Sequence, residues 1–190
     1  MIKRLLITAG LLGILSQTPA LSTPPHSLDA NLRDTQMSWI RKTINYSRKD
    51  SSIVMIAYKK EHELVYYENG DSVDCFPISL GWDSTRDKQK EGDGRTPEGN
   101  YRIIEVKDMG QTSFHRAFRI NYPNSKDRKQ GKTGSLIEIH GRRGPNAAGT
   151  YDWTSGCIAI SDEDIDSIFN QIRNQDKSGK PVRVTIVKSR

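Results

Sequence analysis

The residues Thr154-Ser155-Gly156-Cys157 place a cysteine directly after a glycine, in surroundings that suit a nucleophile. A free thiol has a pKa of about 8.5, so it needs a base before it becomes a good nucleophile at neutral pH. His140 ends an apolar segment 16 loop residues before Cys157 and could take the thiol proton. The backbone N–H groups of Gly156 and Cys157 could then point at a developing oxyanion. The spacing suggests a nucleophilic cysteine.

Other roles for Cys157 remain open on the residues alone. The chain holds two cysteines, Cys75 and Cys157, which could pair as a disulfide in an oxidising compartment, and Cys157 could also be an inert filler. Cys75 falls inside an expected strand with no glycine or histidine nearby, so we expect it to be a small buried residue. Zinc needs three or four ligands at regular spacing, and no CxxC, HxH or HExxH pattern occurs. We therefore expect no metal and no cofactor.

The elements that must position these residues are mostly strands. Asn69-Gly70 between two strand-like runs predicts a tight hairpin. Ser161 is a good N-cap, and Ile165, Ile168, Phe169 and Ile172 follow it at helical spacing. Strands are expected within 52–60, 63–81, 101–106, 114–124, 135–141, 157–160 and 179–187. Helical spacing also occurs over 31–48, after a Pro-rich lead at 23–30, and loops are expected over 82–100 and 125–134. The chain is predicted to be a mostly β domain with a C-terminal helix and an N-terminal helix.

Residues 1–22 have the pattern of a secretory signal peptide. Lys3 and Arg4 precede an apolar run of eleven residues, and the small residues Ala20 and Ser22 suit cleavage after Ser22. The run is shorter than the roughly 20 residues of a membrane span, so we expect no span in the mature chain. We divide the chain into the signal peptide 1–22, a lead with a helix at 23–50, and a domain at 51–190 that carries the cysteine and the histidine.

Composition narrows the class of partner. The chain has 34% hydrophobic and 27% charged residues, which is typical of one domain with a polar surface, and its net charge is +6. A mildly basic surface suits a nearby anionic polymer such as a cell wall. We expect no nucleic-acid partner, because a signal peptide and so modest a charge both argue against one.

Three segments together resemble the catalytic domain of the L,D-transpeptidases, the YkuD-type family. They are Gly92–Tyr101, which contains the Thr-Pro-x-Gly-x-Tyr signature, Leu136–Gly141 with its His-Gly pair, and Trp153–Ile160 with the Ser/Thr-x-Gly-Cys pattern. The likeness spans roughly residues 52–188 and keeps the motifs in the family's order. It implies a YkuD-type β-sandwich with the site at one edge, and a periplasmic enzyme in cell wall remodelling.

The resemblance also implies a reaction. Cys157 would attack the L-centre carbonyl of the third residue, usually meso-diaminopimelate, in a peptidoglycan tetrapeptide stem, and D-alanine would leave. An amine from a neighbouring stem, or from a wall-anchored protein, would resolve the thioester. His140 would be the base and acid, oriented by a backbone carbonyl near Gly141. Carbapenems would acylate the same thiol.

One position departs from the family pattern. Many members have an arginine two residues after the cysteine, whereas this chain has Ala159. The Gly-Cys-Ile-Ala form resembles a subgroup in which some members are hydrolases, either L,D-carboxypeptidases or amidases that release wall-bound protein. Arg142 or Arg143 could supply the lost charge. A non-catalytic wall-binding module is the remaining alternative.

Further residues are expected at the edge of this site. Substrate contacts are expected from the neighbours of the cysteine and histidine and from the upstream signature, namely Thr154, Ser155, Arg142, Tyr101 and Trp153. Trp82 and Trp153 could form walls of a groove, with packing as their other role, and His115 could lie near the site or on the surface.

Overall fold

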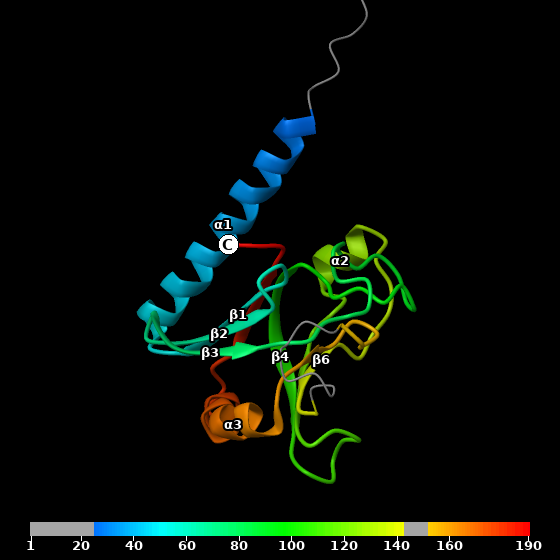
Figure 1. Ribbon diagram of the computed structural model, residues 1–190. Helices are drawn as coiled ribbons and strands as arrows, with labels where there is room; N and C mark the ends of the chain where they lie inside the picture. Colours follow the sequence, from blue (N-terminus) through cyan, green and yellow to red (C-terminus); the bar gives the residue numbers. More distant parts are fainter. Residues whose placement is uncertain (1–24, 143–151) are drawn as a thin grey trace, which may run out of the picture.

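In the computed structural model the described residues are 25–142 and 152–190, with side chains described from residue 30 onward (Figure 1). The elements in chain order are α1 (Pro25–Asp50), β1 (Ile53–Tyr58), β2 (Glu63–Glu68), β3 (Asp71–Pro77), β4 (Gly99–Lys107), β5 (Ala117–Ile120), α2 (Ser125–Lys129), β6 (Glu138–His140), β7 (Ile158–Ala159), α3 (Asp162–Lys177) and β8 (Arg183–Val187). The predicted signal peptide 1–22 and Arg143 lie outside the described residues.

The strands form one curled sheet in the order β3-β2-β1-β8-β4-β5-β6-β7. The β1–β8 and β6–β7 pairs are parallel, and the other pairs are antiparallel. The two ends of the sheet meet, because Ser79 just after β3 exchanges two backbone hydrogen bonds with Ala159 of β7. The predicted mostly β, YkuD-type fold with a helix near each end is confirmed.

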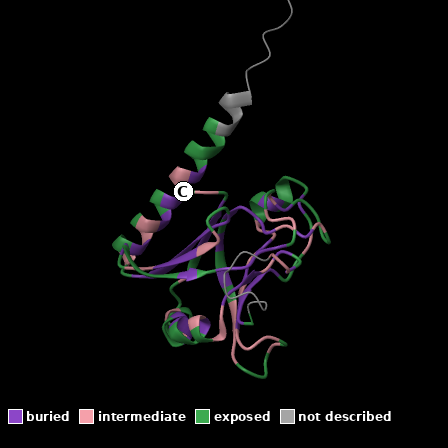
Figure 2. Cartoon of the chain, viewed as in Figure 1, coloured by how far each residue is buried: buried purple, intermediate pink, exposed green. Residues whose placement is uncertain are grey.

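The central strand β1 is buried on both of its faces. Met55 and Ala57 belong to a core shared with α3, while Ile56 and Tyr58 belong to a second cluster under α1. Two-sided burial explains why this strand is a continuous apolar run instead of an alternating one. Figure 2 shows the buried residues concentrated in the strands and on the inner sides of the helices.

Helix α1 is longer than the sequence predicted. It begins at Pro25, within the segment expected to be a Pro-rich lead, and proline is well tolerated in a first helical turn. Its second half packs on β8, β1 and β2, whereas its first half extends away from the body (Figure 1). Buried Gln36 ties it down by donating to Glu98 Oε2 at 2.8 Å and accepting from the Lys188 N–H at 3.0 Å.

The hairpin and the C-terminal helix are confirmed. Asn69 and Gly70 both have positive φ, 55° and 85°, as a two-residue hairpin of this type requires. The Ser161 hydroxyl caps α3 by accepting from the Asp164 N–H at 3.0 Å. The four apolar residues predicted for the inner face of α3 are all buried: Ile165, Ile168, Phe169 and Ile172.

Two local predictions were wrong. Cys75 is exposed and free, because β3 is an edge strand whose residues 71–75 all face solvent. The basic segment expected as a loop over 125–134 contains the short helix α2, which Asn124 and Asp127 begin with a capping box. The apolar periodicity used for the longer helices cannot detect a single turn of this kind.

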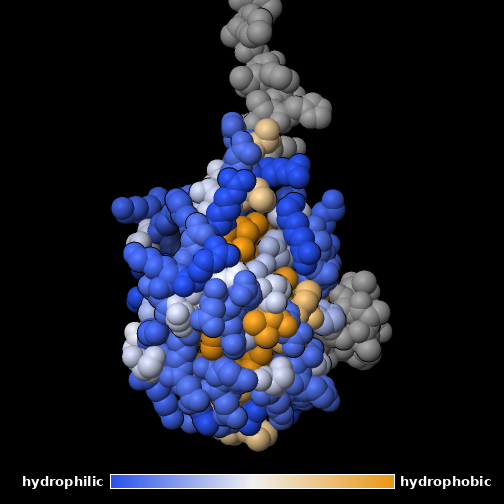
Figure 3. All heavy atoms as spheres, turned by 90° about the vertical axis from the view of Figure 1, so that its left-hand side faces the viewer, coloured by the Kyte–Doolittle hydropathy of each residue, from blue (hydrophilic) through white to orange (hydrophobic). Residues whose placement is uncertain are grey.

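The surface of the protein is largely polar, as the content of charged residues predicts. Figure 3 shows a largely hydrophilic face with hydrophobic atoms gathered in small areas. None of the helices in the described parts of the chain combines the length and the apolar content that a bilayer crossing requires.

Candidate active site

The register between β6 and β7 brings the cysteine and histidine segments together. Ile139 lies opposite Ile158 and His140 lies opposite Ala159 in this parallel ladder. Cys157 comes directly before β7, and side chains alternate along a strand, so Cys157 belongs to the same face as Ala159 and His140. Two short strands separated by a loop in sequence therefore place Cys157 and His140 on one face of the sheet, at neighbouring positions of the ladder.

The imidazole of His140 is buried and held in one orientation. Its Nδ1 lies 2.6 Å from the carbonyl oxygen of Gly141. A carbonyl can only accept, so Nδ1 carries the proton and Nε2 presents its lone pair. Phe114 stacks on the ring with 3.6 Å between centroids, and Trp153 contacts it edge-on at 5.9 Å.

Burial keeps this imidazole uncharged. Desolvation lowers the pKa of His140 below its ordinary value of 6.5, against the opposing effects of the Gly141 carbonyl and the Glu138 carboxylate. At neutral pH the ring is therefore a neutral base with a free acceptor nitrogen.

The thiol of Cys157 is half-buried, and its Sγ lies 3.5 Å from the Leu136 carbonyl oxygen. Burial raises the pKa of Cys157 to about 11, although the backbone N–H of Glu138 and the charge of Lys88 both lower it. The resting pair is thus a neutral thiol beside a neutral imidazole. A nucleophile arises here only when the proton moves from sulfur to nitrogen.

Thr154 fixes the turn that presents the cysteine. Its hydroxyl donates to the Cys157 carbonyl at 2.7 Å and accepts from the Gly156 N–H at 3.1 Å. The Gly156 N–H, predicted to face an oxyanion, is therefore engaged within the turn. The Cys157 N–H has no partner among the described residues and is the better candidate donor.

The upstream signature packs directly beneath this turn. Gly156 has a φ of +130°, and a Cβ at this position would lie 2.5 Å from the Arg95 carbonyl oxygen. In the upstream signature itself, a Cβ on Gly94 would lie 1.9 Å from the ring of Trp82. Only glycine fits at both positions, which explains why these two distant motifs each contain one.

A groove of about 330 Å³ opens beside the thiol. Its walls come from two loop segments and the cysteine turn: Lys88, Glu91, Gly92, Gly134, Ser135, Leu136, Ile137, Ser155 and Cys157. Ser155 is exposed in this groove, and its contact with a substrate stays a prediction. Cys157 is one of its lining residues, so a ligand bound in the groove would lie beside the thiol.

Other predicted site residues lie apart from the groove. Tyr101 is buried in the core on β4, where its hydroxyl donates to the Glu98 carbonyl at 3.2 Å. The Arg142 side chain is exposed, while its backbone N–H donates to Asp162 Oδ1 at 2.6 Å. His115 pairs with Asp166 of α3 at 2.9 Å, beside Gly141.

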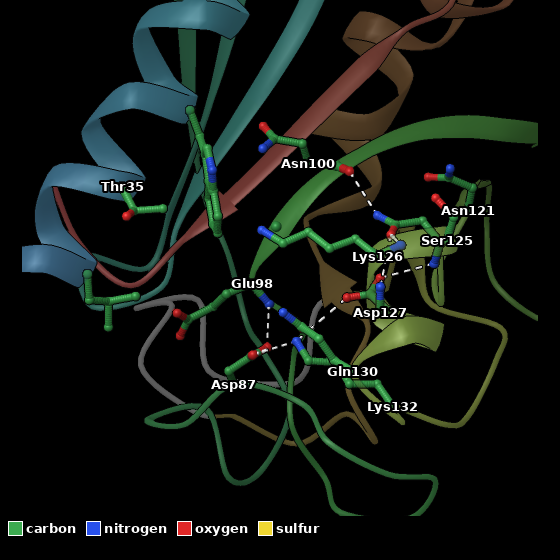
Figure 4. Close-up of a pocket in the computed structure, with 14 residues that line it drawn as sticks. Thr35, Asp87, Glu98, Asn100, Asn121, Ser125, Lys126, Asp127, Gln130 and Lys132 are labelled. Carbon is green, nitrogen blue, oxygen red and sulfur yellow. Dashed lines mark hydrogen bonds and ion pairs between the residues drawn. The ribbon is translucent and has the colours of Figure 1, made fainter. Parts of the chain in front are cut away.

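A larger cavity of about 560 Å³ lies between α1, the start of β4 and residues 121–132 (Figure 4). At its floor the Lys132 ammonium bridges two carboxylates, Asp87 at 2.6 Å and Asp127 at 3.6 Å. Thr133, the next residue, donates its backbone N–H to the Gln89 carbonyl at 3.1 Å. These contacts join the two loop segments that also form the walls of the Cys157 groove.

The motif reading missed two residues of the site. Phe114 is adjacent to His115, the aromatic residue that was considered, and it is Phe114 that stacks on His140. Lys88 lies in the predicted loop over 82–100, yet it is 2% exposed. Nothing in the local sequence separates a buried lysine from its exposed neighbours.

The chain belongs to the L,D-transpeptidase catalytic domain family, YkuD, whose pattern it matches over residues 52–186. YafK of Escherichia coli K12, which carries the name of an L,D-transpeptidase, is 29% identical over 142 residues, covering 72% of this chain and 54% of YafK. The chain therefore spans about half the length of the curated relatives it matches.

Solved structures agree with this family. Pgp2 of Campylobacter jejuni, described as a helical cell shape determining protein, is 26% identical with a TM-score of 0.56, covering 82% of this chain and 56% of Pgp2. Bd1075 of Bdellovibrio bacteriovorus shares the fold at 24% identity and a TM-score of 0.56, covering 73% of this chain and 49% of that protein.

Proposed function

We propose that this protein is a cysteine-dependent L,D-transpeptidase that acts on peptidoglycan tetrapeptide stems. The observation that carries the proposal is the His140 Nδ1 contact with the Gly141 carbonyl at 2.6 Å, because it leaves Nε2 free on the strand beside Cys157. A fixed neutral base next to a protonated thiol is what attack on an amide carbonyl requires.

The first half-reaction transfers the stem to the enzyme. The Cys157 proton moves to His140 Nε2 as sulfur attacks the L-centre carbonyl carbon of meso-diaminopimelate. The tetrahedral oxyanion accepts from the Cys157 N–H. The C–N bond to D-alanine then breaks, and the leaving amine takes the proton back from His140. A thioester remains on Cys157, and the imidazole of His140 is again neutral.

The second half-reaction returns the thiol. An amine of a neighbouring stem, or of a wall-anchored protein, attacks the thioester carbonyl and gives its proton to His140. The C–S bond breaks and the sulfur regains that proton. If water attacks the thioester in place of the amine, the protein is an L,D-carboxypeptidase or an amidase. This alternative is retained because the Gly-Cys-Ile-Ala form, with Ala159 in place of arginine, resembles a subgroup that contains hydrolases.

The proposed location is the periplasm. A signal peptide at 1–22, cleaved after Ser22, would carry the domain across the inner membrane. The name of YafK as an L,D-transpeptidase and the description of Pgp2 as a cell shape determining protein support this setting. N-terminal sequencing of the protein recovered from periplasmic extract tests the location, and a chain that retains Met1 in the cytoplasmic fraction would contradict it.

The reaction is tested by incubating purified protein with muropeptides and analysing the products by mass. Cross-links between third residues indicate a transpeptidase, tetrapeptides trimmed to tripeptides indicate a carboxypeptidase, and release of a protein-linked stem indicates the amidase. Every product should vanish in Cys157→Ala. Absence of all three products from the folded, reduced protein, together with no carbapenem adduct at Cys157, would leave the wall-binding module.

A further inference from the structure

Ala159 stands where many family members have arginine, and its surroundings exclude a large charged side chain. The residue is fully buried between His140 of β6 and Ser79, with backbone hydrogen bonds to Ser79 on one side. A cation that contacts a ligand in the groove therefore comes from another part of the chain. The groove beside the thiol contains one lysine among its described lining residues, Lys88.

Lys88 reaches the groove from the loop that precedes the upstream signature. Its Nζ donates to Asp93 Oδ1 at 2.8 Å, and its Cε would lie 3.3 Å from a Cβ on Gly134, a residue of the opposite wall. An ammonium has three donors, and Asp93 uses one of them within the described structure. Lys88 is 2% exposed and its charge is paired with the Asp93 carboxylate, so its remaining donors are what it can offer to a ligand in the groove.

Other contacts keep Lys88 in place. Asp93 also accepts from the backbone N–H groups of Gln89, Lys90 and Arg95, at 2.7, 3.0 and 3.1 Å, so it closes the loop around the ammonium. The residue before Lys88 is Asp87, which Figure 4 shows tied to Lys132. Asp87 thus anchors the loop in the larger cavity, and Lys88 faces the groove.

The carboxylates near Lys88 are either paired with a cation or exposed to solvent, so they do not prevent an anion from binding. Burial raises the pKa of Asp93, but Lys88 and the three backbone donors lower it well below its usual range, so Asp93 stays ionised. Glu138, which lies behind the thiol, is paired with Lys107 at 2.7 Å. Glu91 is the remaining carboxylate among the lining residues, and it is exposed to solvent.

We propose that Lys88 is the specificity-determining cation of the Cys157 groove and selects stem peptides by a carboxylate of the donor. This inference rests on the proposed function, since it assumes that the groove receives a peptide stem. The tetrapeptide offers two carboxylates near the scissile bond: the C-terminus of the leaving D-alanine and the D-centre carboxylate of diaminopimelate. Lys88 thus offers the groove a cationic hydrogen-bond donor, which Ala159 cannot.

The test compares kcat/KM for three tetrapeptides with the reduced full protein. One is the free acid, one carries a D-alanine amide at its C-terminus, and one is amidated at the diaminopimelate D-centre. We expect the free acid to exceed one of the two amides by about 10- to 100-fold, the range for a hydrogen bond to a charged group. The amide with the lower kcat/KM than the free acid identifies the carboxylate that Lys88 binds.

The variants separate recognition from folding. Lys88→Met/Asp93→Asn removes the pair without leaving a buried charge and should bring the acid-to-amide ratio close to one, mainly through KM. Lys88→Arg should retain a ratio clearly above one. Lys90→Met, which removes an exposed lysine two residues along the same loop, should leave the ratio unchanged.

The two proposals fail in different ways. If the wild-type protein processes the acid and both amides equally, Lys88 does not select a carboxylate, although the enzyme assignment stands. If the double variant folds and keeps the full wild-type ratio, the inference is likewise overturned. If the wild-type protein processes no stem peptide, the proposed function itself is wrong.

Discussion

Ala159 of β7 lies directly opposite His140 of β6, with Ser79 on its other side. Ala159 is fully buried where the two ends of the curled sheet meet, so we expect no room there for an arginine side chain. We predict that Ala159→Arg costs more than about 3 kcal/mol, because it buries an unpaired charge in a packed site. Urea unfolding measures the cost. Ser155→Arg in the exposed part of the same turn should change stability by less than about 0.5 kcal/mol, and equal stability of both variants would contradict the prediction.

The Cys157 thiol should alkylate slowly at neutral pH and faster as pH rises. Burial raises its pKa to about 11, so the thiolate fraction grows about tenfold per pH unit through the range from 7 to 10. Iodoacetamide labelling in a Cys75→Ser background, followed by mass spectrometry, gives the rate. A rate that is already constant below pH 7 would indicate a preformed thiolate–imidazolium pair instead.

Activity should fall on the acid side only below pH 6.5. Desolvation lowers the pKa of His140 from that value, so the neutral base persists until the pH drops through the lowered pKa. The same shift makes the fold lose stability as pH falls below 6.5, because the unfolded chain binds the proton more readily. A pH profile of kcat/KM measures the first effect, and an acid limb centred above 6.5 would contradict the assignment of His140 as base.

Thr154 should be more sensitive to loss of its hydroxyl than to loss of its methyl group. Thr154→Val removes both hydrogen bonds that hold the cysteine turn, and should cost about 1–3 kcal/mol with a marked fall in kcat. Thr154→Ser keeps the hydroxyl and serves as the matched control. Thermal unfolding measures the loss of stability, and muropeptide turnover measures the loss of activity. If the two variants were equally active, the hydroxyl of Thr154 would not be needed to hold the cysteine turn.

Helix α1 should contribute to the stability of the domain although it precedes the family match. Gln36→Leu breaks two buried hydrogen bonds, to Glu98 and Lys188, and is expected to cost about 1–3 kcal/mol. Arg41→Ala on the exposed side of the same helix is the control. If deleting residues 25–50 left the unfolding free energy unchanged, α1 would be an accessory segment.

The sequence predicted the parts of this fold that local patterns encode. Asn69-Gly70 specifies its hairpin through two positive φ angles, and the spacing from Ile165 to Ile172 specifies the buried side of α3. Both depend on residues a few positions apart. The burial of Cys75 was predicted wrongly, since whether a strand lies at an edge depends on pairing with distant strands.

The sequence by itself predicted the candidate pair, since His140-Gly141 and Gly156-Cys157 stand in segments that resemble the family's motifs and follow one another in its order. Only the tertiary structure decided their protonation, since burial lowers the pKa of His140, against which Phe114 and Trp153 pack, and raises the pKa of Cys157 to about 11. It also decided that Lys88 is buried beside the Cys157 groove. Lys88 and Ala159 are 71 residues apart, and the burial of each depends on contact with a distant part of the chain, Gly134 for Lys88 and Ser79 for Ala159.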